Sequence, residues 1–235
     1  MNKLISLELK RNSLKSYHIS VVITTVIMLG FLYLLAAIPK MDPADTDAEL
    51  FMSYNFIIGL SNVVCMAIFS IMSAVMASKF IVEEYTGKKA ILLFSYPIER
   101  KKILEAKILT VFSYTAFSMI VCGGFILTVF LGTERLFPLC SDTISLGMIW
   151  DSILSLLCYS FIAALLGVIS LWFGFMKKSI SVTIVASCII VSVICQIMGM
   201  SLFYRPVIIS TLAATLIIAV LAWSNLHYQV KRMEV

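Results

Sequence analysis

Residues 82–107 read VEEYTGKKAILLFSYPIERKKILEAK and form the longest polar break between the hydrophobic runs of the chain. Helix-forming residues predict one short helix over 83–94. Proline biases the residue before it away from the α region and suits the first turn of a new helix. Pro97 therefore predicts a break, followed by a second short helix over 97–107.

The composition around this segment excludes a soluble globular domain. Of the 235 residues, 61% are hydrophobic and 13% are charged, whereas soluble domains are about half apolar and about a quarter charged. A formal net charge of +5 in such a chain indicates a membrane face rather than nucleic acid as the partner. The six cysteines show no CxxC spacing, which favours packing as small apolar side chains over disulfides or metal sites.

Hydrophobic runs on both sides of the segment predict an all-α integral membrane fold with six transmembrane helices. Residues 1–18 predict an N-terminal amphipathic helix at the membrane interface. The alternative is a basic flank that only sets the topology. Residues 19–235 then form one membrane domain, in which 82–107 joins the second and third spans. The predicted spans are about 19–38, 56–81, 108–131, 152–174, 180–198 and 207–226.

Basic residues predict the orientation of these spans. Fifteen of the 18 lysines and arginines fall before the first span, within 79–107, at 177–178 and in the C-terminal tail. Lys40, Arg135 and Arg205 fall one in each of the other three loops. The positive-inside rule therefore predicts that both termini are cytoplasmic.

The second helix of the segment has too few apolar residues for a place in a core. Ile98, Ile103 and Leu104 suit a helix that lies flat, with one side on its own membrane domain and the other toward a partner protein. The alternative is an ordinary solvated loop that lysines and arginines hold at the lipid surface. The residues alone leave both interpretations open.

An ordered set of residues runs through the segment: a glutamate, a glycine, a leucine pair, a serine, a Pro-Ile pair, an arginine, an isoleucine and a closing lysine. They are Glu84, Gly87, Leu92, Leu93, Ser95, Pro97, Ile98, Arg100, Ile103 and Lys107. The set resembles the coupling helix region of permease subunits in the ABC-2 family of ATP-driven transporters. It departs from that pattern at 88–90, where Thr, Leu and Glu are usual, and at Glu99, where a small polar residue is common.

The resemblance implies a permease subunit of an ABC exporter in a bacterial plasma membrane. Two six-span permeases, identical or related, would pair within the lipid, and two cytoplasmic ABC ATPase subunits would dock beneath them. ATP and Mg²⁺ would bind in those partners and not in this chain. The expected passenger is an antimicrobial peptide, a drug or a lipid-like molecule moved outward, with resistance to antimicrobial peptides as one role. The implied ATPase-docking residues are Glu84, Gly87, Ser95, Pro97, Ile98, Arg100, Lys101, Lys102, Ile103 and Lys107.

The sequence predicts no chemistry of its own. It has no GxxxxGK[ST] phosphate loop, no nucleophile elbow and no set of His, Cys or carboxylate residues spaced for a metal. We therefore expect no catalytic residue, no directly bound cofactor and no metal site, and we expect that the chain is not an enzyme. His18 and His227 are interpreted as solvated flanks at the inner interface.

Polar residues in the spans are few and mostly neutral. Asn62 and Gln196 are the costliest to leave unpaired, so they are candidates for lining a path, with bonding between helices as the alternative. Asp151 at the outer edge of the fourth span is a candidate outer gate, with an interfacial helix cap as the alternative. A short surface helix over 139–151 is a further expectation for this outer loop.

Two other function classes remain as alternatives. A channel or secondary carrier that works without an ATPase is disfavoured because the spans lack the central charges that ion coupling needs. A membrane-embedded enzyme is disfavoured because no catalytic set converges. The many methionines and phenylalanines favour an apolar or amphipathic passenger in either kind of transporter.

Overall fold

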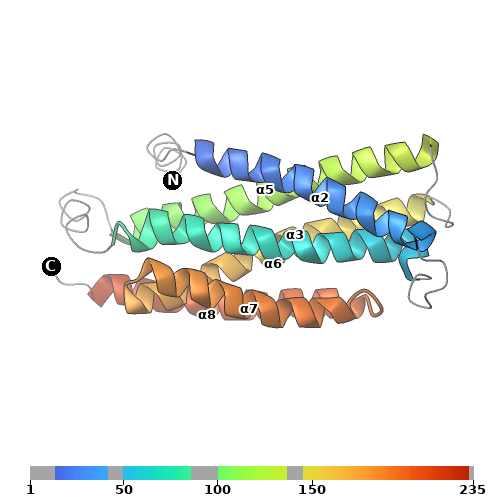
Figure 1. Ribbon diagram of the computed structural model, residues 1–235. Helices are drawn as coiled ribbons and strands as arrows, with labels where there is room; N and C mark the ends of the chain where they lie inside the picture. The colour runs from blue at the N-terminus through green and yellow to red at the C-terminus, as the bar shows by residue number, and fades with distance from the viewer. Residues whose placement is uncertain (1–13, 42–49, 86–99, 137–144, 233–235) are drawn as a thin grey trace.

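The computed structural model describes residues 14–41, 50–85, 100–136 and 145–232. Within these ranges six helices are long and apolar enough to cross a membrane, which confirms the predicted fold class (Figure 1). A π-helix, η2 (Ser78–Val82), extends the second of them. The six helices are α2 (Lys15–Met41), α3 (Tyr54–Ala77), α5 (Arg100–Leu136), α6 (Leu146–Lys177), α7 (Ile180–Met200) and α8 (Pro206–Arg232).

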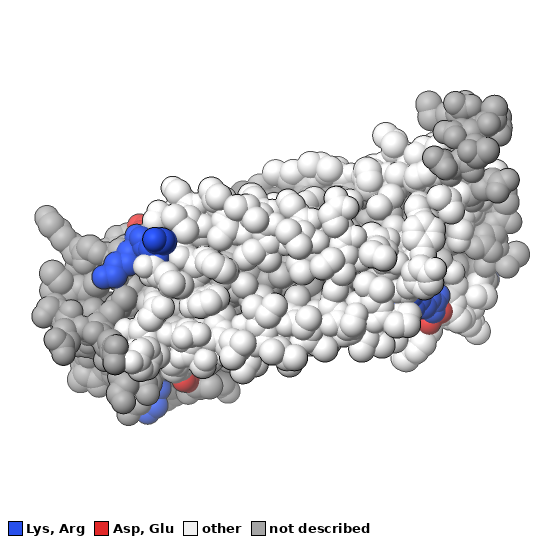
Figure 2. Space-filling view, turned by 90° about the horizontal axis from the view of Figure 1, so that it is seen from below, with Lys and Arg blue, Asp and Glu red and all other residues white. Residues whose placement is uncertain are grey.

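The helices run alternately up and down one long bundle (Figure 1). The start of α2 and the end of α8 lie together at one end, which we call the terminal end. The opposite end, where α7 turns into α8, we call the distal end. The face shown in Figure 2 carries its described charged side chains at these two ends, with an uncharged band between them. That distribution is the one expected of a bundle that spans a bilayer.

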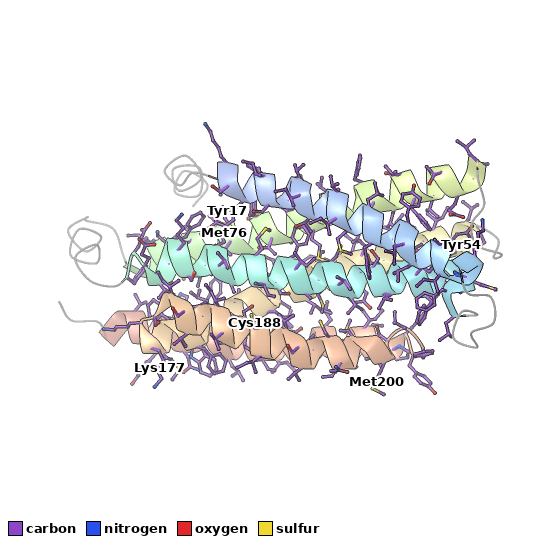
Figure 3. The ribbon with its side chains drawn as sticks, in the orientation of Figure 1. Tyr17, Tyr54, Met76, Lys177, Cys188 and Met200 are labelled. Carbon is purple, nitrogen blue, oxygen red and sulfur yellow. The ribbon has the colours of Figure 1, made fainter. Side chains whose placement is uncertain are left out.

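Helices α3 and α6 form the centre of the bundle. In their apolar windows 56% and 61% of the residues are buried, against 22%, 17% and 22% for α2, α7 and α8. One buried cluster includes Tyr54 toward the distal end, and a second includes Tyr17 and Met76 toward the terminal end (Figure 3). The outer helices therefore present most of their apolar surface to lipid or to another chain.

Small residues let the central helices approach closely. A Cβ added at Gly167 of α6 would lie 2.7 Å from the Cβ of Ser73 on α3. A Cβ at Gly123 of α5 would collide with Leu156 of α6, whereas one at Gly124 would meet no atom within 4 Å. Of the Gly123-Gly124 pair, only the first residue is therefore needed for close packing.

The third span begins earlier than the sequence predicts. Helix α5 is continuous from Arg100, so the prediction of a separate flat helix over 97–107 is wrong for residues 100–107. No helix breaker lies between Arg100 and the apolar run, and extending a helix is far easier than nucleating a new one. Ile103 and Leu104 are buried, with Leu104 in the terminal cluster.

Other predicted boundaries also move outward. Helix α2 runs past the predicted end of the first span at 38 and includes Pro39 near its end. The helix expected on the outer surface over 139–151 is wrong for residues 146–151, because they form the first turns of α6. The loop predicted between the fifth and sixth spans corresponds to the break between Met200 and Pro206. An interfacial helix was expected over 1–18. Residues 1–13 of it lie outside the described residues, and residues 15–18 belong to α2.

Substitution of Gly167 by alanine tests the contact between the two central helices. We expect Gly167→Ala to lower the free energy of unfolding by about 1–3 kcal/mol, because overpacking forces the backbones apart. Gly124→Ala is the matched control, since its new methyl enters open space and alanine favours a helix by up to about 1 kcal/mol over glycine. Denaturant unfolding in mild detergent measures both. Equal stability of the two variants would contradict the close approach of α3 and α6.

Candidate functional site

A buried ion pair joins the residues on the two sides of the predicted coupling segment. Lys107 of α5 is only 2% exposed, although lysine is rarely buried without a partner. Its Nζ lies 2.6 Å from the Glu84 carboxylate, just beyond η2. The same Nζ donates to the Phe80 carbonyl at 2.9 Å. One ammonium group therefore ties the end of the described range 50–85 to the first turns of α5.

The π-helix places the partners of this lysine. The Glu83 amide donates to the Ser78 carbonyl, five residues back, whereas the Tyr85 amide donates to the Ile81 carbonyl, four residues back. The hydrogen-bond register thus changes at the end of η2, and Lys107 binds the Phe80 carbonyl at that change. Short π-helical turns within α-helices are frequent at functional sites.

Helix α5 makes further polar contacts near its start. Glu105 Oε1 lies 2.7 Å from His227 Nε2 on α8. Further along α5 toward the distal end, the Tyr114 hydroxyl lies 3.0 Å from His18 Nδ1 on α2. His18 is exposed, as the interpretation of a solvated flank predicts, whereas His227 is half-buried. Each histidine also joins its own helix to α5, which the sequence did not predict. Together with Lys107, these contacts connect about the first four turns of α5 to α2, η2 and α8.

The predicted docking residues fall into three groups. Glu84, Ile103 and Lys107 are placed in or against the bundle, and Lys102 is exposed. Arg100 and Lys101 start α5, but their side chains lie outside what the structure describes. Gly87, Ser95, Pro97 and Ile98 lie outside the described residues altogether. ATPase docking by this set stays a prediction.

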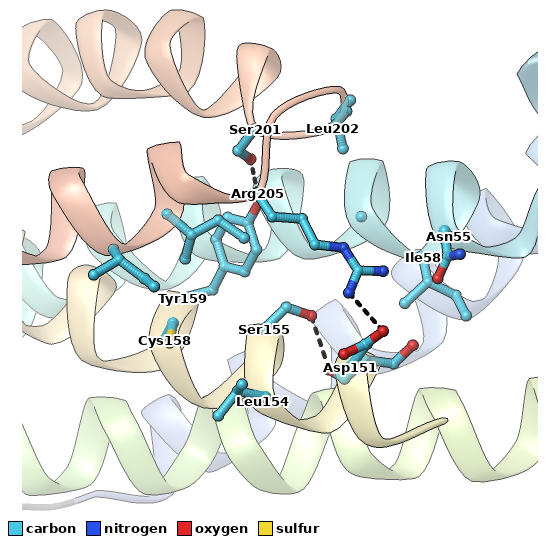
Figure 4. Close-up of a pocket in the computed structure, with 14 residues that line it drawn as sticks. Asn55, Ile58, Asp151, Leu154, Ser155, Cys158, Tyr159, Ser201, Leu202 and Arg205 are labelled. Atoms are coloured by element: carbon cyan, nitrogen blue, oxygen red, sulfur yellow. Dashed lines mark hydrogen bonds and ion pairs between the residues drawn. The ribbon is translucent and has the colours of Figure 1, made fainter. Parts of the chain in front are cut away.

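The distal end holds a cavity of about 250 Å³ between α3, α6 and the turn into α8 (Figure 4). Asp151 of α6 and Arg205 of the turn form an ion pair at its edge, with 2.5 Å between Oδ2 and Nη1. Deeper in, the Tyr159 hydroxyl and Ser201 Oγ are 2.8 Å apart. Asn55 of α3 also lines the cavity.

Asp151 does not cap a helix. The N-cap of α6 is Ser145, whose side chain accepts a hydrogen bond from the Met148 amide, so the cap interpretation of Asp151 is wrong. Asp151 instead joins α6 to the turn between α7 and α8 through Arg205. A role as an outer gate stays a prediction, and it now includes a second residue that the sequence did not single out.

The two predicted path-lining residues lie in different surroundings in the described part of the chain. Asn62 is 4% exposed in the core between α2, α3 and α5, and its side-chain nitrogen has no hydrogen-bond partner in the part of the chain that the structure describes. Gln196 is exposed on α7. Path lining by either residue stays a prediction.

Several polar residues of the bundle were missed by sequence reasoning. Glu134 lies beyond the predicted end of the third span at 131, yet it belongs to α5, where its Oε2 accepts a hydrogen bond from the buried Tyr54 hydroxyl at 2.9 Å. Arg205 was counted only as a basic residue in a loop. Glu134 and Arg205 are each far in sequence from the residue they contact. The sequence therefore offered only one indication of these contacts, which is a charged residue at the edge of a span. Among the described residues no group of His, Cys, Asp or Glu is placed to hold a metal ion.

The sequence pattern described as "ABC-2 family transporter protein" matches residues 4–193 of this chain. A relative, the Bacillus subtilis (strain 168) protein named "Uncharacterized protein YcbO", is 26% identical over 195 residues. The alignment covers 81% of this chain and 82% of that relative. No solved structure matches the chain. The matched region includes both Glu84 and Lys107, as well as Asp151, and ends within α7 before Arg205.

Removing one partner of the buried ion pair tests its contribution to the fold. We expect Lys107→Met to lower the free energy of unfolding by about 3–5 kcal/mol, because the Glu84 carboxylate loses its buried counter-charge. The double variant Glu84→Gln/Lys107→Met leaves no such charge and should recover much of that loss. A double-mutant cycle of unfolding in detergent measures the coupling. Additive losses in the double variant would show that the two residues do not stabilise each other.

Proposed function

This chain belongs to the ABC-2 family of transporters, and we propose that it is the permease subunit of an exporter that a separate ATPase drives. The terminal end, which holds most of the lysines and arginines in the described ranges, faces the cytoplasm of a bacterial cell in this proposal. Two such permeases, identical or related, pair in the plasma membrane, and two ATPase subunits dock below them. ATP and Mg²⁺ bind in those ATPase subunits.

The observation that carries the proposal is the buried pair between Glu84 and Lys107. Both residues belong to the set that resembles the coupling helix region of the family, and they hold the two flanks of residues 86–99 together. A partner that moves this segment therefore displaces the end of η2 and the start of α5 as one unit. Such a unit transmits a push better than two flanks that separate under load.

The contacts of α5 favour the spread of that displacement through the bundle. Glu105 connects it to α8 through His227, and Tyr114 connects it to α2 through His18. A docked ATPase that binds one arrangement of this end more tightly than another would shift the population of the whole permease. That differential binding is the free energy that the coupling requires.

The passenger in this proposal is apolar or amphipathic and leaves at the distal end. Support comes from the cavity there, which combines apolar walls with an ion pair at its edge. An antimicrobial peptide, a drug or a lipid-like molecule has both kinds of surface.

Purification of the tagged chain from its native host tests the ATPase partner directly. We expect an ATP-binding subunit to co-purify at equal stoichiometry, and its rate of ATP hydrolysis to change when the two are reconstituted together in liposomes. Full transport by the chain alone in liposomes would overturn the proposal in favour of a channel or secondary carrier.

Charge reversal tests the docking surface. We expect the triple variant Arg100→Glu/Lys101→Glu/Lys102→Glu to capture at least tenfold less ATPase than the original chain. The new glutamates would repel the acidic groups of the ATPase that the original basic residues face in this proposal. The control triple Lys15→Glu/Lys177→Glu/Lys178→Glu has the same net charge at the same end and should retain it. Pull-down from detergent, with membrane insertion checked by cysteine labelling, measures both. Equal capture by the two triples would exclude the start of α5 as the docking surface.

A further inference from the structure

The cavity at the distal end has the size and lining of a headgroup site. Its volume of about 250 Å³ lies below the ~300–1,000 Å³ of pockets that enclose a whole small molecule. The Asp151–Arg205 pair lies at one edge, and the Tyr159 and Ser201 hydroxyls lie deeper (Figure 4). Asn55 and Ser155 add further polar groups to the lining.

One side of the cavity reaches the apolar surface of the bundle. Leu154 of α6 and Ile209 of α8 both line the cavity, and they are also 53% and 69% exposed. Leu154 lies one turn into α6 from Asp151, and Ile209 lies one turn into α8 from Arg205. Because exposed leucine and isoleucine on membrane spans face hydrocarbon, this side opens toward lipid chains.

The ion pair at the edge is suited to exchange with a ligand. The Asp151 and Arg205 side chains are 40% and 61% exposed, so their pairing contributes little net free energy. A purely anionic ligand at Arg205 would leave Asp151 beside a like charge. A ligand that carries both an ammonium and an acidic group satisfies both side chains at once.

We propose that this cavity binds the headgroup of a zwitterionic lipid-like amphiphile. Its ammonium contacts Asp151, its phosphate or carboxylate contacts Arg205, and its hydrocarbon chains run along Leu154 and Ile209. The site recognises the amphiphile by charge arrangement and by attachment to the membrane. Binding there does not depend on the ATPase partner, so the site stands or fails separately from the transport proposal.

Native mass spectrometry of the full chain in mild detergent tests this site. Phosphatidylethanolamine and phosphatidylglycerol with the same acyl chains are offered in equal amounts. We expect at least fivefold preferential retention of phosphatidylethanolamine, because it carries both charges. Equal retention of the two lipids would overturn the proposal. Glycerophosphoethanolamine, which lacks chains, should not displace the lipid at equal concentration, and displacement would overturn the amphiphile assignment.

Charge variants give the site a directional signature. Asp151→Asn leaves a net positive edge and should move the preference toward phosphatidylglycerol, whereas Arg205→Gln should weaken retention of both lipids. The exchanged pair Asp151→Arg/Arg205→Asp restores one charge of each sign and should restore the preference for phosphatidylethanolamine. A preference that none of these variants changes would place the lipid elsewhere and overturn the proposal.

A filling variant keeps the test valid if the charge variants fold poorly. Leu154→Trp occupies the lipid-facing side of the cavity and should reduce retention of phosphatidylethanolamine at least fivefold. Val193→Trp is the matched control, because Val193 is an equally exposed apolar residue on α7 outside the cavity lining. Equal retention by the two tryptophan variants would overturn the assignment of the lipid to this cavity.

Discussion

An ammonium group withdrawn from water must be neutralised and hydrogen-bonded, and in this bundle that requirement falls on Lys107. Its partners are the Glu84 carboxylate and the Phe80 carbonyl, both contributed by the end of the preceding span. The lysine thereby fixes the position of the start of α5 against the end of η2. The burial of Leu104 and the contact between Glu105 and His227 follow from the same placement of α5.

The two ends of the bundle use ion pairs of opposite character. At the terminal end the Lys107 side chain is 1% exposed, so separating it from Glu84 would leave a charge in a dry environment. At the distal end Asp151 and Arg205 are open to solvent, and water or a ligand replaces either partner at little cost. The first pair suits a rigid joint, and the second suits a contact that opens and closes.

The sequence predicted the fold well and the site only in part. Six apolar runs of the right length were sufficient for six spans, because hydrocarbon thickness fixes helix length. Helix ends were less predictable, since a polar residue such as Glu134 continues a helix when a partner such as Tyr54 donates a hydrogen bond to it. The pairing of Asp151 with Arg205 joins residues from separate helices, and no local pattern predicts such a contact. Glu84 and Lys107 were singled out by resemblance, whereas their mutual contact was not foreseen.

The π-helical turn at Ser78–Val82 accommodates one residue more than an α-helical turn of the same length. One extra residue in a helix rotates everything after it by about 100° relative to an uninterrupted α-helix. That rotational offset decides which side of the chain Glu84 occupies when it meets α5. A homologue with the same number of residues but a regular α-helix at this point would present a different side chain to the lysine. A relative that winds this stretch as a regular α-helix therefore needs one residue fewer here to keep its acidic side chain facing the lysine.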